Sequence, residues 1–292
     1  MEDLSAHVGH LTGEQSDALA EFKTKLADVK LYRPVLDGQP ASHDDPTLLR
    51  FLRARRFDVE KAKKQFADTE MWRTEHDIDT LFRTFDPEEF EDARRFYPRW
   101  TGRRDKGGRP LYVYRIASVS SIQRELNEAS SERRYQRIIV LYEAMRRFVF
   151  PLCSKLPHST ETPISSVMTI IDLADTSLAT MWNLRNHLQE ASRLATAHYP
   201  ETLHRTVIIN APDYFNRVWS WVKSWFDEGT RRKIFVLTRD EMVATLTQFV
   251  DSKDLPKIYG GELEWEFTDE PLLDEDTTKE IREMPKGPVV FP

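Results

Sequence analysis

The stretch Asp105-Lys106-Gly107-Gly108-Arg109-Pro110-Leu111-Tyr112-Val113-Tyr114 joins a strong turn signal to a short apolar and aromatic run. Adjacent glycines followed shortly by a proline favour a turn. A short run that contains β-branched and aromatic residues, bounded by turn residues, is typical of a strand. We therefore expect a β-strand over residues 111–114, introduced by this turn.

Similar runs recur along the chain, and amphipathic stretches separate them. Strands are expected over residues 167–173, 206–209 and 234–237, and helices over about 132–150, 179–198 and 213–226. Alternation of strands with long helices requires crossover connections, which join parallel strands. From residue 90 onward the sequence thus predicts an α/β fold with a mostly parallel sheet.

The chain before residue 90 has helical patterns instead. Asp45 and Pro46 supply a capping carboxylate and a proline at the first helical turn. Asp58 can cap the helix that follows. We expect a small all-α domain over residues 20–88, preceded by a loose polar arm.

Charge is unevenly distributed between an α/β domain expected over residues 90–262 and a tail over residues 263–292. Residues 262–276 hold eight acids and neither Lys nor Arg, so the formal net charge of −6 becomes +2 when these eight are set aside. The body is therefore mildly basic. Charged tails are most often solvated, and we assign this one no function.

Composition and motifs limit the classes of function. Cys153 is the single cysteine, which excludes an internal disulfide and a cysteine-based zinc site and favours a reducing cytosol. No run of about 18 apolar residues and no secretory signal pattern is present. The motifs of serine hydrolases, dinucleotide binders, P-loop NTPases and zinc proteases are absent, so we expect neither enzyme activity nor a metal site. A dense basic stripe for nucleic acid is also missing.

Several segments, taken in order, match one known family. They are residues 47–59 (Thr-Leu-Leu-Arg-Phe-Leu-Arg-Ala-Arg-Arg-Phe-Asp-Val), Trp72-Arg73, Phe96-Tyr97-Pro98, residues 105–112, His198-Tyr199-Pro200-Glu201, residues 208–212, Lys233-Ile234-Phe235 and residues 255–261. On these segments the chain resembles the Sec14-like (CRAL-TRIO) family over about residues 45–262. The resemblance implies a helical N-terminal unit packed on an α/β domain. The sheet of that domain would form the floor of a lipid pocket, which a mobile helix gates.

The resemblance also implies a headgroup site for phosphatidylinositol, formed by Arg55, Arg56, Glu201, Thr230 and Lys233. A buried phosphate needs charged or hydrogen-bonding partners, and the three basic residues suit this role. The glutamate would accept hydrogen bonds from inositol hydroxyls. Alternatively, the two arginines are solvated charges at a helix end, and the glutamate is a helix cap or an ion-pair partner.

A second set implied by the resemblance would bind phosphatidylcholine through Tyr112, Tyr142, Thr169 and Tyr199. Aromatic faces suit a quaternary ammonium group. Two positions depart from the family pattern, because Thr101 replaces an expected tyrosine and Val167 an expected serine. The second ligand therefore stays open between phosphatidylcholine, a sterol, another apolar lipid and a different phospholipid.

Residues 213–226 form an amphipathic stretch with a wide apolar arc. Its candidate gate residues are Phe215, Trp219, Trp221, Val222, Trp225 and Phe226. The arc is wider than a surface helix needs, and tryptophan is favoured at membrane interfaces. Core packing against two neighbours would give the same pattern, but the family places its gating helix here. We expect this helix to open at a membrane and allow lipid exchange.

These expectations combine into one functional hypothesis. The chain is expected to be a cytosolic, monomeric phospholipid-binding and transfer protein, peripheral at Golgi or endosomal membranes, with no cofactor besides its bound phospholipid. It would hold phosphatidylinositol in an internal pocket and exchange it with membranes. The alternatives are a carrier of a sterol or other apolar lipid, and a non-transferring sensor that presents lipid to, or regulates, a lipid kinase or GTPase.

Overall fold

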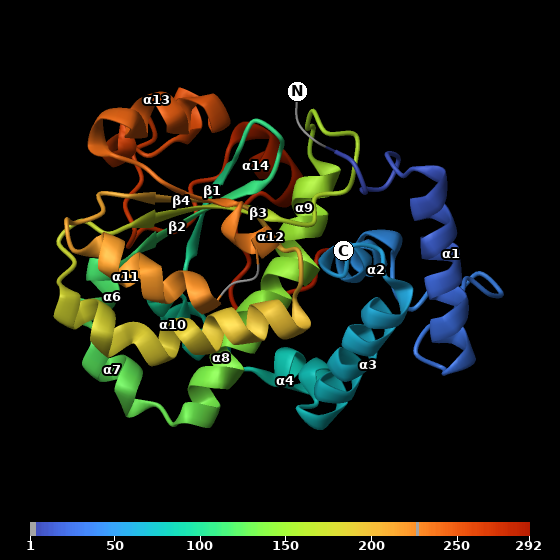
Figure 1. The fold of residues 1–292 in the computed structure, drawn as a ribbon. Helices are drawn as coiled ribbons and strands as arrows, with labels where there is room; N and C mark the ends of the chain where they lie inside the picture. The colour runs from blue at the N-terminus through green and yellow to red at the C-terminus, as the bar shows by residue number, and fades with distance from the viewer. Residues whose placement is uncertain (1–3, 226–227) are drawn as a thin grey trace.

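A five-stranded sheet forms the centre of the computed structural model, which describes residues 4–225 and 228–292 (Figure 1). The strands lie side by side in chain order: β1 (Arg99–Arg104), β2 (Pro110–Arg115), β3 (Val167–Asp172), β4 (Leu203–Ile209) and β5 (Ile234–Val236). Strands β2 to β5 are parallel, and β1 runs antiparallel to β2. The predicted α/β fold with a mostly parallel sheet is confirmed.

Strand β1 was not predicted from the sequence. It reads Arg-Trp-Thr-Gly-Arg-Arg and lacks the β-branched and aromatic density of the other strands. The turn at residues 105–110 joins it to β2, and Asp105 Oδ1 accepts hydrogen bonds from the N–H groups of Gly107 and Arg109 at 2.9 Å each. Gly108 has φ +88°, a conformation that L side chains rarely adopt. The turn therefore closes a hairpin rather than introducing the first strand.

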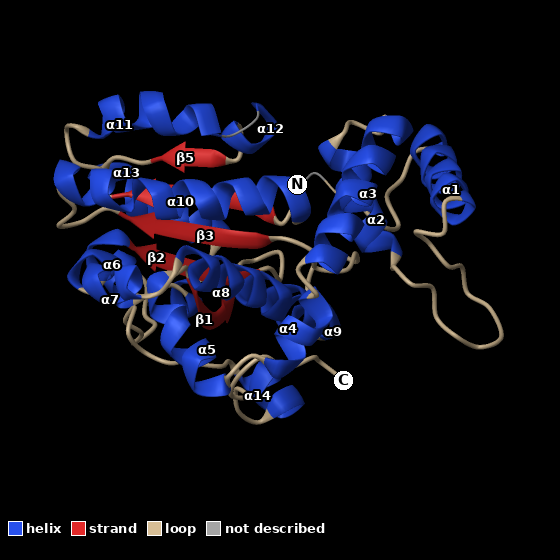
Figure 2. Ribbon diagram, turned by 90° about the horizontal axis from the view of Figure 1, so that it is seen from below, coloured by secondary structure: helices blue, strands red, loops and turns tan. Residues whose placement is uncertain are grey.

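Helices cover both faces of the sheet (Figures 1 and 2). Helices α8 (Ser131–Ala144) and α10 (Leu178–His198) lie on one face, and α13 (Arg239–Phe249) lies on the other. A π-helical turn (Met145–Val149) continues α8 into α9 (Phe150–Lys155). Between β4 and the edge strand β5 lie α11 (Phe215–Val222), a 3-10 turn (Lys223–Trp225) and α12 (Glu228–Arg231). The shorter helices are α4 (Ile78–Thr84), α5 (Pro87–Ala93), α6 (Ile116–Ser121), α7 (Gln123–Glu128) and α14 (Glu275–Ile281).

Three helices, α1 (Gly13–Asp28), α2 (Asp45–Ala54) and α3 (Val59–Glu75), stand beside the α/β part and share their own apolar cluster (Figure 2). The amide of Gln65 on α3 donates to the carbonyls of Thr196 and Ala197 at the end of α10, at 3.1 and 3.0 Å. These bonds fix α3 against the α/β part.

The start of α1 corrects an expectation. Thr12 caps this helix through a reciprocal capping box with Gln15, and Leu19 is buried against the α1–α3 cluster. Residues 13–19 are therefore helical and are not part of a loose arm. The capping box was visible in the sequence, but the polar composition of this segment concealed it.

The C-terminal segment packs against the body and is not simply solvated. Trp265 and Phe267 are buried, and the N–H of Leu272 donates to the carbonyl of Thr101 on β1 at 2.8 Å. Near the end of the chain, the N–H of Phe291 donates to the carbonyl of Arg147 at 2.9 Å. The acids alternate with apolar residues here, so the acids face outward while the apolar side chains pack inward.

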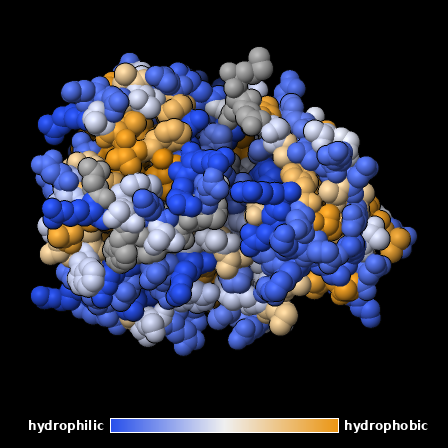
Figure 3. Space-filling model, viewed as in Figure 1, coloured by the Kyte–Doolittle hydropathy of each residue, from blue (hydrophilic) through white to orange (hydrophobic). Residues whose placement is uncertain are grey.

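The surface retains some apolar area. Phe235 and Val236 on β5 and Val243 on α13 are exposed, and Figure 3 shows apolar surface over these elements. Within the described residues, no helix is both long enough and apolar enough to cross a membrane.

Candidate functional site

A cavity of about 680 Å³ lies between the sheet and the helices α8, α10 and α11. This volume is within the range of about 300–1,000 Å³ that is usual for ligand cavities. The side chains of Tyr112, Thr169 and Ile208 project into it from β2, β3 and β4. Thr169 pairs with Tyr112 in the register of the sheet, so these two residues lie next to each other on the cavity floor.

Most of the cavity wall is apolar. Helix α8 contributes Ile138 and Leu141, and the π-helical turn contributes Phe148. The C-terminal segment closes one side with Met284 and Val289. Such a wall suits acyl chains, whose burial is worth about 0.8 kcal/mol per CH₂ group.

One end of the cavity is strongly polar. The predicted headgroup residues Arg55, Arg56, Glu201 and Thr230 all line it. Lys233 does not line the cavity directly, but its Nζ donates to Glu201 Oε2 at 2.8 Å and to the carbonyl of Leu203 at 3.1 Å. The structure thus gathers at one place five residues that are separated by up to 178 positions in the chain.

Local backbone geometry positions this polar end. Arg55 caps the C-terminus of α2, and the next two residues, Arg56 and Phe57, have φ of 52° and 61°. Glu201, in the turn between α10 and β4, has φ of 59°. Residues other than glycine rarely adopt this left-handed conformation, and such strain concentrates at binding sites.

The two adjacent arginines differ in their surroundings. Arg56 is 86% exposed and lies 3.8 Å from Glu228 of α12. Arg55 is half-buried and donates to the carbonyl of Ala54 at 3.0 Å. Of these two residues, which both line the cavity, only Arg55 is partly shielded from solvent, so the two positions are not equivalent.

Arg53 is a further cation at this end that the sequence analysis did not single out. Its side chain is 10% exposed, lines the cavity and places Nε 3.9 Å from Glu201 Oε2. The sequence contained a sign that Arg53 is buried, because it directly follows the mostly apolar stretch of residues 48–52 in an amphipathic helix. The family motif drew attention to the next two basic residues instead.

The candidate phosphatidylcholine residues also line the cavity. Tyr142 and Tyr199 stack with ring centroids 4.8 Å apart and an interplanar angle of 15°. Burial raises the pKa of Tyr142 to about 12, and burial together with the nearby Glu143 carboxylate raises the pKa of Tyr199. Both phenols are therefore neutral, with apolar faces available to a ligand.

Tyr199 belongs to a buried ionic cluster centred on Glu143, whose side chain is 0% exposed. Glu143 accepts hydrogen bonds from Tyr199 at 2.8 Å, Arg73 at 2.8 Å, Arg146 at 2.9 Å and Arg147 at 2.6 Å. Burial opposes ionisation of the Glu143 carboxyl, but the guanidinium groups of Arg146 and Arg73 outweigh it and hold its pKa below the usual range. This cluster fixes Tyr199 and joins α3 to α8.

The two positions that depart from the family pattern occupy different places. Thr101 is fully buried in the β1–β2 hairpin, where its hydroxyl donates to the carbonyl of Leu111 at 3.1 Å, and it does not line the cavity. Val167 does line the cavity and offers only methyl groups. Three of the expected tyrosines thus line the cavity, whereas neither Thr101 nor Val167 offers a polar group to it.

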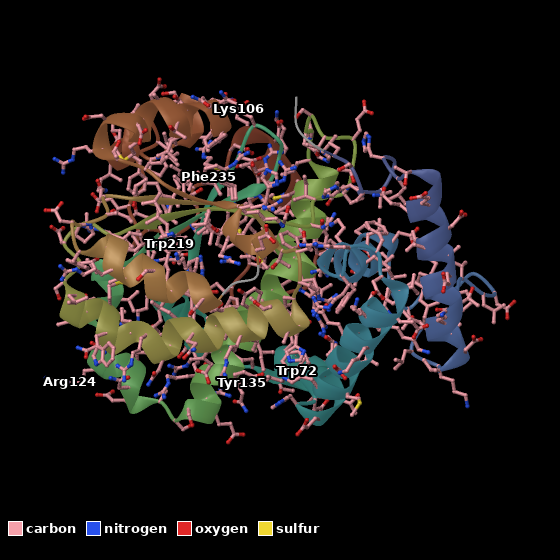
Figure 4. The ribbon with its side chains drawn as sticks, viewed as in Figure 1. Trp72, Lys106, Arg124, Tyr135, Trp219 and Phe235 are labelled. Atoms are coloured by element: carbon pink, nitrogen blue, oxygen red, sulfur yellow. The ribbon has the colours of Figure 1, made fainter. Side chains whose placement is uncertain are left out.

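The expected gate helix corresponds to α11 and the turn after it. Phe215, Trp219 and Val222 line the cavity, and the rings of Phe215 and Trp219 lie 6.1 Å apart at 24°. Figure 4 shows Trp219 on α11 beside the sheet. The side chains of Trp221 and Trp225, and residue Phe226, lie outside the described part of the structure.

Helix α3 is held to the cavity wall by aromatic contacts. Trp72 donates from Nε1 to Tyr135 of α8 at 2.9 Å, as the pair in Figure 4 illustrates. Its ring stacks on His198 of α10 with centroids 3.9 Å apart and an angle of 6°. The N-terminal helices therefore brace α8 and α10, the two long walls of the cavity.

Comparison with known proteins is consistent with this geometry. The model of the CRAL/TRIO domain matches residues 97–261, and that of the CRAL/TRIO N-terminal domain matches residues 18–68. The SEC14 cytosolic factor of Kluyveromyces lactis is 34% identical over 262 residues, covering 89% of this chain and 82% of that protein. The Sec14 cytosolic factor of Schizosaccharomyces pombe is 30% identical, with 87% and 85% covered.

Two further comparisons add a named function and a solved structure. The phosphatidylinositol/phosphatidylcholine transfer protein SFH7 of Arabidopsis thaliana is 35% identical over 80% of this chain, which spans 43% of that longer protein. The crystal structure of Sfh5 superposes with a TM-score of 0.66 at 16% identity and covers 93% of this chain and 96% of that one. At that identity the similarity to Sfh5 supports the fold alone.

Proposed function

The chain belongs to the CRAL/TRIO family of Sec14-like proteins, and from this premise we propose that it binds phosphatidylinositol in its internal cavity and exchanges it with membranes. The observation that supports this most directly is the combination of one apolar cavity with a cluster of cations at one end. The apolar wall would take the acyl chains, and the cations would take the phosphate.

The proposed headgroup site consists of Arg55, Arg56, Glu201, Thr230 and Lys233. The ion pair between Glu201 and Lys233 orients the carboxylate at the cavity mouth. There it would accept hydrogen bonds from the inositol hydroxyls, while the shielded guanidinium of Arg55 would bind the phosphodiester.

The second ligand proposed is a lipid that depends on the stacked tyrosines and not on a strand hydroxyl at position 167. Tyr112, Tyr142 and Tyr199 offer ring faces for a choline group, and the Val167 side chain offers no hydrogen bond to its phosphate. Phosphatidylcholine would therefore bind less tightly than phosphatidylinositol. An apolar lipid such as a sterol has no phosphate that needs a hydrogen bond from position 167, so Val167 would weaken its binding less.

Exchange would occur when α11 moves away from the cavity at a membrane surface. Phe215 and Trp219 would then leave the ligand and enter the bilayer interface. Leu178 and Trp182 at the start of α10 are 56% and 58% exposed and would extend the membrane-contacting surface. The proposed place of action is the cytoplasmic surface of Golgi or endosomal membranes.

The test is transfer of labelled phosphatidylinositol from donor to acceptor vesicles. We expect transfer that saturates with protein concentration and that falls when Trp221 and Trp225 are both replaced by Ala. Stoichiometric binding without transfer would favour the sensor that presents lipid to a lipid kinase or GTPase. Absence of phosphatidylinositol binding would refute the proposal.

A further inference from the structure

Arg53 occupies a position that none of the proposed headgroup roles explains. Arg53, Arg55 and Arg56 all line the cavity. Arg53 lies within α2, whereas Arg55 is the C-cap of this helix and Arg56 follows the cap. The side chain of Arg53 is only 10% exposed, and its Nε has no hydrogen-bond partner among the described residues. Nine-tenths burial of an arginine without a hydrogen-bonded counter-ion is unfavourable unless a ligand completes the site.

The nearest anion, Glu201, does not satisfy Arg53. The Glu201 Oε2 atom lies 3.9 Å from Arg53 Nε, beyond hydrogen-bond range, but only 2.8 Å from Lys233 Nζ. The Glu201 carboxylate therefore lies between Lys233 and Arg53, and it is hydrogen-bonded only to Lys233 of these two. With Arg55 and the Arg56–Glu228 pair at the same cavity end, four cations face two anions, which leaves room for a further negative charge.

The electrostatic surroundings of Arg53 also disfavour its charged form when no ligand is bound. Burial lowers the pKa of its guanidinium, Glu201 only partly opposes this, and Arg109 adds a smaller unfavourable charge. Arg50, one turn earlier, is also buried and has an unpaired Nη1, but it does not line the cavity. The contrast separates a structural arginine from one that a ligand in the cavity can reach.

We propose that Arg53 binds the phosphodiester oxygens of an anionic phospholipid and makes the cavity prefer anionic over zwitterionic headgroups. A phosphate in the cavity would offer the exposed part of the Arg53 guanidinium an anionic acceptor and leave Glu201 to the headgroup hydroxyls. A choline group brought to the same place would meet an excess of cations. This inference rests on the proposed function, because it assigns a selectivity determinant within the same headgroup site.

The shared chemistry is a phosphate ester, and a soluble compound could also supply it. The apolar wall separates the two sources, because only a lipid gains the burial of its acyl chains. A soluble inositol phosphate is therefore expected to compete weakly, at far higher concentrations than phosphatidylinositol. Competition at equal concentrations would identify a soluble phosphate ester as the ligand and would overturn the lipid assignment.

The test compares Arg53→Gln and Arg53→Lys with a matched control, Arg83→Gln, an exposed arginine on α4. The probes are vesicles that contain labelled phosphatidylinositol or labelled phosphatidylcholine, with bound lipid measured for each. For Arg53→Gln we expect phosphatidylinositol affinity to fall about 10- to 100-fold, the usual range for a charge-assisted hydrogen bond. Phosphatidylcholine affinity should stay within about threefold of wild type, so the ratio of the two lipids changes.

Arg53→Lys should recover part of the lost affinity, because it keeps the charge but not the two-pronged geometry. Thermal unfolding of each variant separates an effect on lipid binding from an effect on stability.

If Arg53→Gln does not fold, Arg53→Lys decides, and a phosphatidylinositol affinity of this variant equal to that of wild type would overturn the inference. An unchanged ratio of the two lipids in folded Arg53→Gln overturns the inference alone. Failure of the wild-type protein to bind phosphatidylinositol overturns the proposed function as well.

Discussion

Glu143 is a fully buried carboxylate that balances three partly buried arginines at the junction of α3 and α8. Arg73, Arg146 and Arg147 all donate to it, and its side chain has no exposed surface. Removal of one partner from a buried ion pair leaves an uncompensated charge, which is far more costly than the pair is favourable.

Glu143→Gln is therefore expected to lower the free energy of unfolding by about 3–5 kcal/mol. The amide keeps the size of the side chain and can still accept from Tyr199, so the loss reports the charge alone. Urea unfolding measures it. Glu128→Gln on the exposed face of α7 serves as the control and should show no measurable change. Equal behaviour of the two variants would contradict the assigned role.

A buried histidine makes stability depend on pH. His187 on α10 is 8% exposed, and burial lowers its pKa to about 4, while the Phe96 carbonyl raises it slightly and Arg134 lowers it further. The unfolded chain, with a histidine pKa near 6.5, binds the proton more tightly. The stabilising contribution of neutral His187 is therefore complete above about pH 6.5 and is lost as the pH falls towards 4.

At pH 5 this contribution has decreased by about 2 kcal/mol. His187→Gln should remove it, so the variant should lose less stability than wild type between pH 7.5 and pH 5. The measurement is the free energy of unfolding in urea at both values. Identical changes in the two proteins would show that His187 does not contribute.

The arginines at the end of α2 show what sequence analysis can reach at the residue scale. The residues around position 55 that the family resemblance singled out line the polar end of the cavity. The resemblance could not distinguish the environments of Arg53, Arg55 and Arg56. These depend on the left-handed turn at Arg56 and Phe57, which leaves Arg56 in solvent while Arg53 stays at the cavity wall.

At the scale of elements, strands were predicted where β-branched and aromatic residues are dense and were missed elsewhere. Strands β2 to β5 follow the expected runs, although β4 begins three residues earlier than predicted. Strand β1 was not predicted because its arginines are shielded from solvent only by segments that are distant in sequence. Arg99, for example, donates to the carbonyl of Phe267 at 3.0 Å. The segment that contains Phe267 was expected to be solvated. The missed strand and the misjudged C-terminal segment have the same cause, because the two pack against each other and this contact is not visible in the sequence.

The C-terminal segment is an element whose contribution can be tested directly. The ring of Phe291 meets Phe148 edge-on at 6.0 Å between centroids, and Lys155 Nζ lies over the Phe291 ring, 5.5 Å from its centroid. These contacts hold Val289 and Met284 in the cavity wall.

Phe291→Ala should lower the free energy of unfolding by about 1–2 kcal/mol and accelerate loss of preloaded lipid, because the wall opens. Val290→Ala, one residue earlier and 56% exposed, is the matched control and should change neither quantity. Release of labelled lipid after dilution into acceptor vesicles provides the rate. Equal rates for the two variants would show that the segment does not seal the cavity.

For the whole molecule, the arrangement of the parts explains why lipid exchange suits this fold. The N-terminal helices brace α8 and α10 through Trp72 and Gln65, whereas α11 covers the cavity with Phe215, Trp219 and Val222. Rigid walls and one removable cover are what repeated loading and unloading of a lipid requires. The helix over 213–226 was expected from its apolar arc and from the family resemblance, but the contribution of Met284 and Val289 to the cavity wall could be seen only in the folded chain.

The central claim is that phosphatidylinositol is the preferred occupant of the cavity. Native mass spectrometry addresses it most directly, after the purified protein has been equilibrated with vesicles that contain phosphatidylinositol, phosphatidylcholine and a sterol. The account predicts a one-to-one complex with phosphatidylinositol as the dominant species and a smaller fraction with either of the other lipids. A spectrum that contains only the sterol complex, or no phosphatidylinositol complex, would contradict it.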